Sequence, residues 1–441
     1  MDKYKKVVIL DSVILYPEHR YRLNQIAEEI VEYNTCKDDA EVLERVQGAD
    51  CIISCWVDVS NAVIDANPQL RTVAFWTHAY EHRINKEYAI SKGIYVPCIP
   101  DYGTDSVAEL AFIGLLHLYE KMSRRKQRGM DEQILQLVSN DVRKFVSNVK
   151  KNLTGSWMHE YIKSGQLKIM DPEAFKEDTM KGLTVGFLVK ADVLNNDIVK
   201  MFTEGFKMNA IHSCCDVVYD IDIAFRPVDQ LLNESQILIY DSKMIEPSVL
   251  KKVKSGSYLS VIDINDITPR GDSIKGIQLG IIGLGRIGTR VAQIARCAFD
   301  MNVSYYSKTR KPEIEEKYGI TYKPLDKVLC ESEVISFHLP HVGAEGFITN
   351  EMIDRIPMGT TVLNVSVGNI FKDQDYIFNR FKENDLIGYV DVYSTLPPRQ
   401  LLRERKEYLL STYRLGWRTK STVGLKSHKL ITKLALGLKD E

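Results

Sequence analysis

The sequence predicts an α/β protein built on parallel sheets, and three observations lead to that prediction. Apolar, strand-like runs alternate with helix-patterned runs along most of the chain, which is typical of βαβ units. A glycine-rich turn joins one of these strands to the helix that follows it. Two stretches of the chain also resemble each other, as expected of an internal repeat. With 441 residues, 44% of them hydrophobic, the chain is long enough for two or three domains.

The first hundred residues are expected to contain four strands. The apolar runs that predict them are residues 7–10, 51–55, 72–76 and 94–96. Helices are expected between some of these strands, for example at residues 21–32 and 39–46. An apolar helix is expected at residues 106–120, and a polar, charge-rich helical segment continues after it to about residue 151.

The composition argues against several classes of protein. The formal net charge is −1, so the overall charge favours neither nucleic acid nor an anionic membrane as a partner. No apolar run approaches the roughly 20 residues of a membrane helix, and the N-terminus runs straight into a strand without a signal-peptide pattern. The eight cysteines show no zinc-ligand spacing, so we expect no metal site. Reduced thiols in a soluble, cytoplasmic protein fit this pattern best.

The run Gly280-Ile-Ile-Gly283-Leu-Gly285-Arg286-Ile287-Gly288 is the clearest functional motif, and it lies between an expected strand and an expected helix. In such a run Gly283 allows a tight turn, Gly285 lets the backbone approach a pyrophosphate, and Gly288 lets the helix pack closely on the strand. The helix N-terminus offers free N–H groups and partial positive charge to the phosphates. These features predict a dinucleotide-binding site; the alternative is a strand-to-helix turn that only resembles one.

The internal repeat precedes this motif. Three pairs of segments share their pattern: residues 181–189 with 275–283, 232–241 with 329–338, and 255–262 with 358–365. In the first copy, residues 189–194 stand in place of the glycine loop, and Asp192 would occupy the space that a pyrophosphate needs. We therefore expect residues 179–270 to form a degenerate nucleotide-fold half that packs against the second copy. The alternatives are chance similarity between βαβ segments and an independent insertion on a linker.

Further motifs accompany the glycine loop, at residues 303–312, 331–340, 361–366 and 388–393, with one more upstream at residues 105–109. On these motifs the sequence resembles the D-isomer-specific 2-hydroxyacid dehydrogenase family, the glyoxylate and phosphoglycerate dehydrogenase group. The resemblance and the internal repeat together predict four parts. The resemblance implies a flavodoxin-like substrate-type lobe of residues 1–105 and about 410–441, an interdomain helical segment at 106–178 and a Rossmann NAD(P)-binding lobe at 274–395, and the repeat adds the degenerate Rossmann-like half at 179–270.

The resemblance also implies which residues bind the cofactor. The pyrophosphate would lie on residues 285–288, which are Gly285, Arg286, Ile287 and Gly288, after the turn at Gly283. The loop that lines the cofactor pocket corresponds to His338, Leu339 and Pro340. Asp391 corresponds to the family position that contacts the nicotinamide amide.

The ribose position predicts which dinucleotide is preferred. Family members that use NAD usually carry an Asp at the end of the second strand, where this chain has Ser307 followed by Lys308 and Arg310. A hydroxyl followed by two cations suits a 2′-phosphate, so NADP is expected, with NAD as the alternative. The other interpretation is that Lys308 and Arg310 are solvated surface charges.

The catalytic positions of the family are all replaced. The Arg that binds the substrate carboxylate corresponds to Val367, the Glu that supports the catalytic His corresponds to Leu396, and the His itself corresponds to Arg414. Hydride transfer to a ketone needs a proton donor, and an Arg does not readily give up a proton near neutral pH. Arg414 could still bind an anionic substrate. The nearby imidazoles of His78, His82 and His341 are better explained as polar surface or packing residues.

Two functions therefore stay open, and the catalytic residues are unknown in both. The first is an NAD(P)-dependent oxidoreductase that acts on CH–OH donors, with an atypical active site and a small-molecule substrate of unknown identity. The second is a non-catalytic NAD(P)-binding pseudoenzyme, either a regulator or the silent partner subunit of another enzyme. Binding of a dinucleotide does not imply turnover, so the glycine loop supports both. The oligomeric state is not predicted.

Overall fold

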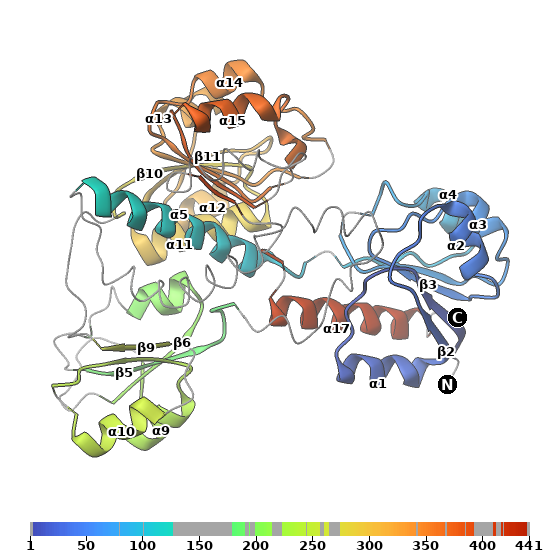
Figure 1. The fold of residues 1–441 in the computed structure, drawn as a ribbon, viewed down its shortest axis with the longest axis horizontal. Coiled ribbons are helices and arrows are strands. Elements are labelled where there is room, and N and C mark those ends of the chain that lie inside the picture. Colours follow the sequence, from blue (N-terminus) through green and yellow to red (C-terminus); the bar gives the residue numbers. More distant parts are fainter. Residues whose placement is uncertain are drawn as a thin grey trace. The chain divides into compact units, whose positions relative to one another are not determined.

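The computed structural model (Figure 1) describes residues 3–78, 80–99, 101–126, 179–189, 194, 199–213, 223–243, 245–255, 260–263, 274–340, 343–366, 368–383, 385–391, 409–411, 416–417 and 419–438. Of these, the residues up to Gly103 and from Trp417 onward form one compact unit. Those from Thr104 to Gly416 form a second unit. The sheets in both units are parallel, which confirms the predicted α/β fold.

The first unit is a sheet with helices on both faces. Its strands pair in the order β2-β1-β3-β4, with bounds β1 (Tyr4–Ile9), β2 (Ala27–Glu32), β3 (Cys51–Ser54) and β4 (Thr72–Phe75). The helices are α1 (Pro17–Ile26), α2 (Asp39–Arg45), α3 (Asn61–Asp65), α4 (Lys86–Ser91) and α17 (Lys420–Gly437). Helices α1 and α17 share one apolar core, and α2, α3 and α4 contribute to the other. Strands buried between two such layers are expected to be apolar throughout, and β3 and β4 are buried along their whole length.

Two predictions about this unit were wrong in part. The helix expected at residues 21–32 ends at Ile26, and the following residues form β2, which pairs only with β1. An edge strand can expose its polar residues to solvent. Ala27–Glu32 therefore lacks the apolar run that predicts a buried strand. The strand expected at residues 94–96 makes only single bridges to β4, at Tyr95 and Cys98. Pro97 lies between them and has no backbone N–H to donate.

The C-terminal helix belongs to the first unit, as the fold prediction requires. Helix α17 contacts both α1 and β4. The indole Nε1 of Trp76 donates to Ser427 Oγ at 3.0 Å, and Ser427 Oγ in turn donates to the backbone oxygen of Ile14. The chain returns later than expected, however. Strand β16 (Leu409–Ser411) still pairs with the sheet of the second unit, so the return falls at Trp417 and not near residue 410.

The second unit contains the larger sheet. Its strands pair in the order β12-β11-β10-β13-β14-β15-β16, with bounds β10 (Gln278–Ile282), β11 (Asn302–Tyr306), β12 (Thr321–Tyr322), β13 (Val334–Phe337), β14 (Thr361–Asn364) and β15 (Ile387–Val390). One face is covered by α5 (Thr104–Lys126) and α11 (Arg286–Phe299). The other is covered by α13 (Leu325–Glu331), α14 (Asn350–Asp354) and α15 (Gln374–Lys382). Helix α12 (Pro312–Tyr318) and the short helix η4 (Gly368–Ile370) complete this part.

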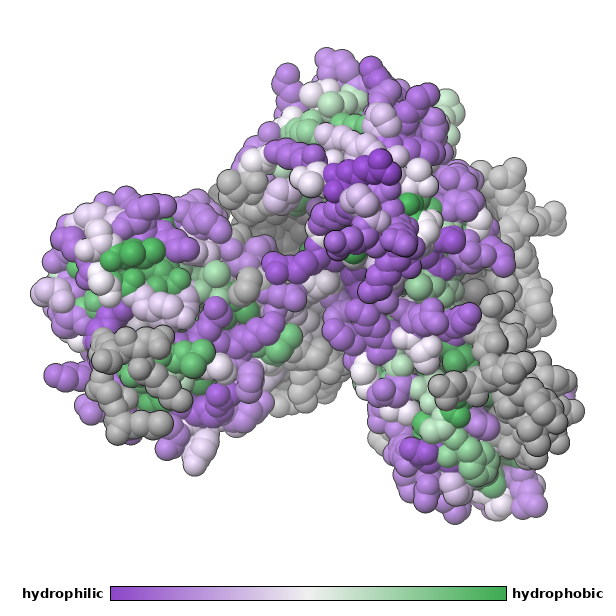
Figure 2. Space-filling view, turned by 180° about the vertical axis from the view of Figure 1, so that it is seen from behind, coloured by the Kyte–Doolittle hydropathy of each residue, from purple (hydrophilic) through white to green (hydrophobic). Residues whose placement is uncertain are grey.

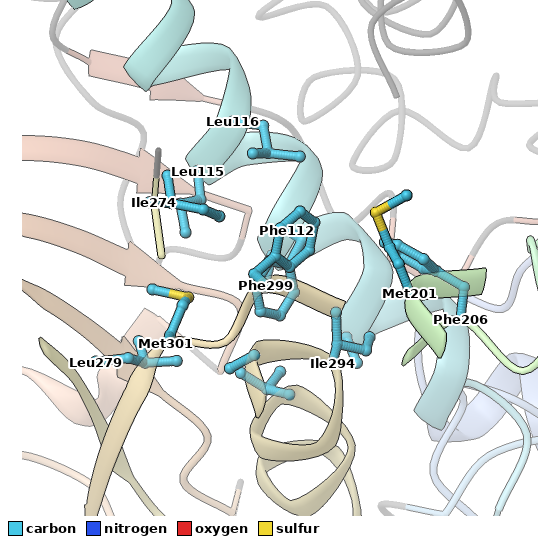
Figure 3. Packing of buried hydrophobic residues seen from close by; sticks show 14 of the residues in the cluster. Phe112, Leu115, Leu116, Met201, Phe206, Ile274, Leu279, Ile294, Phe299 and Met301 are labelled. Atoms are coloured by element: carbon cyan, nitrogen blue, oxygen red, sulfur yellow. The ribbon is translucent and has the colours of Figure 1, made fainter. Parts of the chain in front are cut away.

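A smaller sheet in the same unit lies within residues 179–270, the range for which a degenerate half was predicted. Its strands pair in the order β7-β6-β5-β8-β9, with bounds β5 (Thr184–Leu188), β6 (Asn209–His212), β7 (Ala224–Phe225), β8 (Ile237–Tyr240) and β9 (Ser260–Asp263). Its helices are η2 (Met201–Gly205), α9 (Val228–Glu234) and α10 (Pro247–Ser255). The short helix η2 shares an apolar core with α5 and α11 (Figure 3). The expected contact between this segment and residues 274–395 is therefore present. The segment after α5, residues 127–178, lies outside the described residues.

Candidate functional site

The glycine loop lies at the carboxyl end of β10, in the middle of the larger sheet. Strand β10 is flanked by β11 on one side and β13 on the other, so the strand order reverses at this point. In open parallel sheets, ligands bind in the crevice that such a reversal opens beyond the strand ends. Ile282 pairs with Tyr306 and with Phe337, and therefore the loops after all three strands begin at the same edge.

Gly283 makes the turn out of β10, and its surroundings leave no room for a side chain. Its φ is +99°, a conformation that residues with a Cβ rarely adopt. A Cβ built there would lie 2.4 Å from the backbone oxygen of His338. The backbone N–H of Gly283 donates to the oxygen of Tyr306 at 2.8 Å. Gly283 thus fits between the ends of β11 and β13.

Gly288 and Gly285 differ sharply in their surroundings. A Cβ at Gly288 would lie 2.1 Å from the backbone oxygen of Gly283, because the first turn of α11 packs directly on the loop. A Cβ at Gly285 would meet no atom within 4 Å. Gly285 is the residue that caps α11 at its N-terminus, and no side chain makes a capping hydrogen bond there. The first turn of α11 therefore presents backbone N–H groups beside open space, which is the arrangement that binds a phosphate.

The loop after β11 carries the residues expected to select the cofactor. Ser307 is half-buried, and Lys308 and Arg310 are exposed. Arg310 forms a two-point ion pair with Glu315 of α12, with Nε to Oε1 at 2.9 Å and Nη2 to Oε2 at 2.8 Å. The Arg310 guanidinium, followed by the Tyr305 hydroxyl at 2.7 Å, lowers the pKa of Glu315. The sequence analysis missed this carboxylate, although its position five residues after Arg310, in the first turn of a helix, was visible.

The loop after β13 is tied to its neighbours on both sides. The backbone N–H of His338 donates to Ile282 at 2.8 Å, and that of Leu339 donates to Ser366 Oγ at 2.8 Å. The imidazole Nε2 of His338 lies 2.8 Å from Ser336 Oγ, while its Nδ1 is shielded and has no hydrogen-bond partner among the described residues. Burial lowers the pKa of His338 to about 3, so the ring is neutral at ordinary pH. Pro340 is exposed.

Asp391 follows β15 at the same edge of the sheet, and it is buried. Its backbone N–H donates to Asn364 at 2.9 Å, and its Oδ2 accepts from the N–H of Gly416 at 3.3 Å. The residues expected to bind the cofactor thus follow four strands, β10, β11, β13 and β15, and all lie at the carboxyl edge of one sheet.

The replaced catalytic positions cannot be placed in this geometry. Val367, Leu396, Arg414 and the loop residue His341 lie outside the described residues. His78 and His82 are exposed residues of the first unit, in agreement with their interpretation as polar surface residues. His78 Nδ1 lies 3.4 Å from the hydroxyl of Tyr102.

A buried lysine in the first unit was missed by the sequence analysis. Lys426 of α17 is 1% exposed, and its Nζ lies 3.6 Å from the ring centroid of Trp76, 4.5 Å from that of Tyr102 and 4.7 Å from that of Trp417. Burial lowers its pKa to about 8, while the ring faces stabilise the charged form. The signal was a cation at helical spacing between the apolar residues Val423 and Leu430. Its partners come from distant segments, which no sequence pattern reveals.

The described part of the chain shows neither a cluster of metal-binding side chains nor a helix that could span a membrane. There, no group of three or more His, Cys, Asp or Glu side chains could hold a metal ion. No described helix combines the length and the apolar character needed to cross a membrane. On the face drawn in Figure 2, hydrophilic residues dominate and the hydrophobic ones gather in small groups.

Comparison with known proteins shows that part of the chain is similar to one protein family. Residues 248–413 match the family model described as "D-isomer specific 2-hydroxyacid dehydrogenase, NAD binding domain". A glyoxylate reductase of Aeropyrum pernix is 49% identical over 93 residues, which are 21% of this chain and 28% of that protein. One from Korarchaeum cryptofilum is 32% identical over 148 residues, which are 32% of this chain and 44% of that protein. The chain thus matches less than half the length of these curated relatives.

A solved structure extends the likeness to the whole fold. The TT0316 protein from Thermus thermophilus aligns with a TM-score of 0.58 over 99% of this chain and 97% of its own, at 18% sequence identity. At that identity the likeness concerns the fold alone.

Proposed function

We propose that the chain is a member of the D-isomer specific 2-hydroxyacid dehydrogenase family, whose NAD-binding-domain model matches residues 248–413. On that premise we propose that it is an NAD(P)-dependent oxidoreductase acting on CH–OH donors with an atypical active site. The observation that carries the proposal is the open space beside Gly285 at the N-terminus of α11. Of the three loop glycines, Gly283 and Gly288 have backbone atoms where a side chain would lie, and Gly285, the one that would face a pyrophosphate, has open space there.

The residues at the carboxyl edge of the sheet each bind a different part of the cofactor. The first turn of α11 binds the pyrophosphate through backbone N–H groups. The loop of His338, Leu339 and Pro340 lines the pocket, and Asp391 faces the nicotinamide end. When bound, the nicotinamide donates or accepts the hydride. The neutral His338 ring, whose Nδ1 has no hydrogen-bond partner among the described residues, cannot serve as a general acid near pH 7.

We propose NADP as the preferred dinucleotide, with NAD as the alternative. The support is the absence of an acidic side chain at Ser307 and the two cations that follow it. Titration of the intrinsic fluorescence of NADPH and NADH measures the two dissociation constants directly. We expect tighter binding of NADPH; equal or tighter binding of NADH would refute the preference. Gly285→Asp, which places a carboxylate in the open space, should abolish the binding of both.

A second function is favoured by the catalytic positions themselves. Valine and leucine at 367 and 396 can neither hold a carboxylate nor support a base, and an Arg at 414 is a poor proton donor. A non-catalytic dinucleotide-binding protein, a regulator or silent partner subunit, needs none of these groups. A screen of 2-hydroxy and 2-oxo acids separates the two functions, since only the oxidoreductase oxidises or reduces bound cofactor.

A small-molecule substrate and a cytoplasmic location form part of the proposal. Arg414 makes an anionic substrate a sensible first choice for the screen. All six cysteines in the described part of the chain are free thiols, which suits a reducing compartment.

A further inference from the structure

The smaller sheet repeats individual hydrogen bonds of the larger one as well as its strand order. Before β5, the side-chain amide of Asn209 donates to the backbone oxygen of Gly182 at 3.0 Å. Before β10, that of Asn302 donates to Gly276 at 2.8 Å. Gly182 and Gly276 share a positive φ, of +82° and +77°. The two amides and the two glycines therefore occupy equivalent places.

The rarest backbone conformation in the chain also recurs at equivalent places. Among the described residues, Lys207 and Asp300 are the only ones other than glycine with positive φ, of 55° and 45°. Each follows a phenylalanine, Phe206 or Phe299, at the end of the helix that comes after the first strand of its sheet. The backbone oxygen of each accepts from Gly182 or Gly276 at 3.0 Å. A left-handed non-glycine residue is uncommon, so its recurrence here fixes the alignment of the two segments.

A third correspondence lies between the sheets and the helices that cover them. Ser235 Oγ donates to the backbone oxygen of Leu231 at 2.6 Å, and Ser332 Oγ donates to that of Val328 at 2.6 Å. In the first sheet a Cβ on Gly186 would lie 2.0 Å from the serine oxygen, and in the second a Cβ on Gly280 would lie 2.2 Å from it. Both strands thus need glycine because a serine-capped helix lies directly on them.

This alignment makes residues 204–206 equivalent to residues 297–299, and two of these three pairs of equivalents are neighbours in space. A Cβ on Gly205 would lie 2.5 Å from the Cβ of its equivalent, Ala298. The rings of Phe206 and Phe299 meet edge to face with centroids 5.9 Å apart (Figure 3). Glu204 and Cys297, which directly precede these pairs in the sequence, are equivalents as well.

Contact between equivalent residues is the mark of a two-fold relation. In an isologous interface the same patch occurs on both partners, and residues near the axis meet their own equivalents. In a head-to-tail arrangement, equivalent residues face different neighbours. Two successive pairs of equivalents in contact, Gly205 with Ala298 and Phe206 with Phe299, therefore indicate a local two-fold axis between η2 and α11.

The contact also covers apolar surface that would otherwise be exposed. Phe206 and Phe299 are buried in one cluster together with Phe112 of α5, whose ring stacks on that of Phe299 at 5.2 Å. Polar contacts surround this cluster: Gln293 Nε2 donates to the oxygen of Glu204 at 2.9 Å, and the guanidinium of Arg290 donates to that of Gly205. An apolar patch bordered by polar groups is typical of a protein interface.

We propose that residues 179–263 are an internal pseudo-subunit. They dock on α11 about this local two-fold axis, and they occupy the face of α11 on which a second copy of the chain would otherwise find a self-complementary partner. The proposal does not depend on which reaction the protein catalyses, or on whether it catalyses one.

The docking is tested by crosslinking across the axis. Glu204 is exposed, so Glu204→Cys places a second thiol beside the native Cys297 without disturbing the core. A short bis-maleimide should join the two cysteines within one chain, giving a product of monomer mass in which peptide mapping locates the 204–297 link. Glu204→Ser is the matched control and should give no such link. A covalent dimer joined through this pair, or no link at all, would overturn the docking.

Whether residues 179–263 take the place of a second copy of the chain is tested by disrupting their contact with α11. Gly205→Val forces a side chain into the 2.5 Å gap to Ala298, whereas Gly424→Ala of α17, whose Cβ would meet nothing closer than 3.5 Å, is the matched control. Light scattering after size exclusion should show the valine variant approaching twice the mass of one chain as its concentration rises, with the control unchanged. If the valine variant lacks a native circular dichroism spectrum, Phe206→Ala replaces it. A variant that loses the 204–297 link and still has the mass of one chain would refute the proposal that residues 179–263 take the place of a second copy.

Discussion

Two substitutions in the glycine loop should separate folding from cofactor binding. At Gly283 an added methyl would lie 2.4 Å from the His338 oxygen, and φ is +99°. A strained backbone of this kind costs about 1–3 kcal/mol, and overpacking costs about as much again. Gly283→Ala should therefore lose roughly 2–6 kcal/mol of stability. Since a domain of this size loses roughly 2–4 °C in Tm per kcal/mol, thermal unfolding followed by circular dichroism should show a fall of at least about 4 °C.

Gly285→Ala should behave in the opposite way. Its φ of −76° suits any residue, and the added methyl meets no atom within 4 Å, so the unfolding midpoint should not change. The methyl instead takes space that the pyrophosphate needs. Overpacking of about 1–3 kcal/mol corresponds to a loss of roughly 5- to 150-fold in affinity for NADPH. Fluorescence titration beside the wild type measures this loss. A Gly285→Ala variant that binds as tightly as the wild type would refute the assignment of the open space, and a fully stable Gly283→Ala would refute the steric reasoning.

Three further predictions concern the cofactor, the reaction and the pH. Glu315→Gln removes the carboxylate that holds Arg310, so NADPH should bind up to about fivefold more tightly while NADH is unaffected; titration with an unchanged or weakened NADPH affinity would contradict this. With saturating NADPH, the chain should reduce glyoxylate, hydroxypyruvate and pyruvate at least roughly 10²–10⁴-fold more slowly than family members do, because general acid–base assistance supplies a factor of that size. The rate is measured as the loss of NADPH absorbance. A rate as high as that of family members would reveal a substitute proton donor. Burial raises the pKa of Glu109 from 4.5 to about 8. Between these two pH values the folded chain keeps a proton that the unfolded chain releases. The free energy of unfolding therefore falls as the pH rises from 4.5 to 8, by up to about 1.4 kcal/mol per pH unit. Glu109→Gln should lessen that fall in urea midpoints measured from pH 5 to 8, and an unchanged pH profile would show that other groups cause it.

The cofactor loop could be predicted from the sequence because its chemistry is local. Gly283, Gly285 and Gly288 stand at fixed spacing between a strand and a helix, and their separate steric roles follow from that spacing. Strand β2 could not be predicted in the same way, because a solvent-exposed edge strand lacks the apolar run that marks a buried one.

Contacts between distant segments were beyond the reach of sequence patterns. The Arg310–Glu315 pair is by contrast a local contact across the turn into α12, and it engages one of the two cations that were expected to meet a 2′-phosphate. The rings around Lys426 come from three separate parts of the chain. The preference for NADP, the cofactor-binding roles and the consequences of Val367, Leu396 and Arg414 stay predictions.

The aromatic surroundings of Lys426 have a mechanical consequence. Among the described residues, the first compact unit ends at Gly103 and resumes at Trp417. Tyr102 and Trp417, which stand at these two crossings, both hold the same ammonium group. One side chain of α17 thus holds together the two segments at which the described part of this unit ends and resumes.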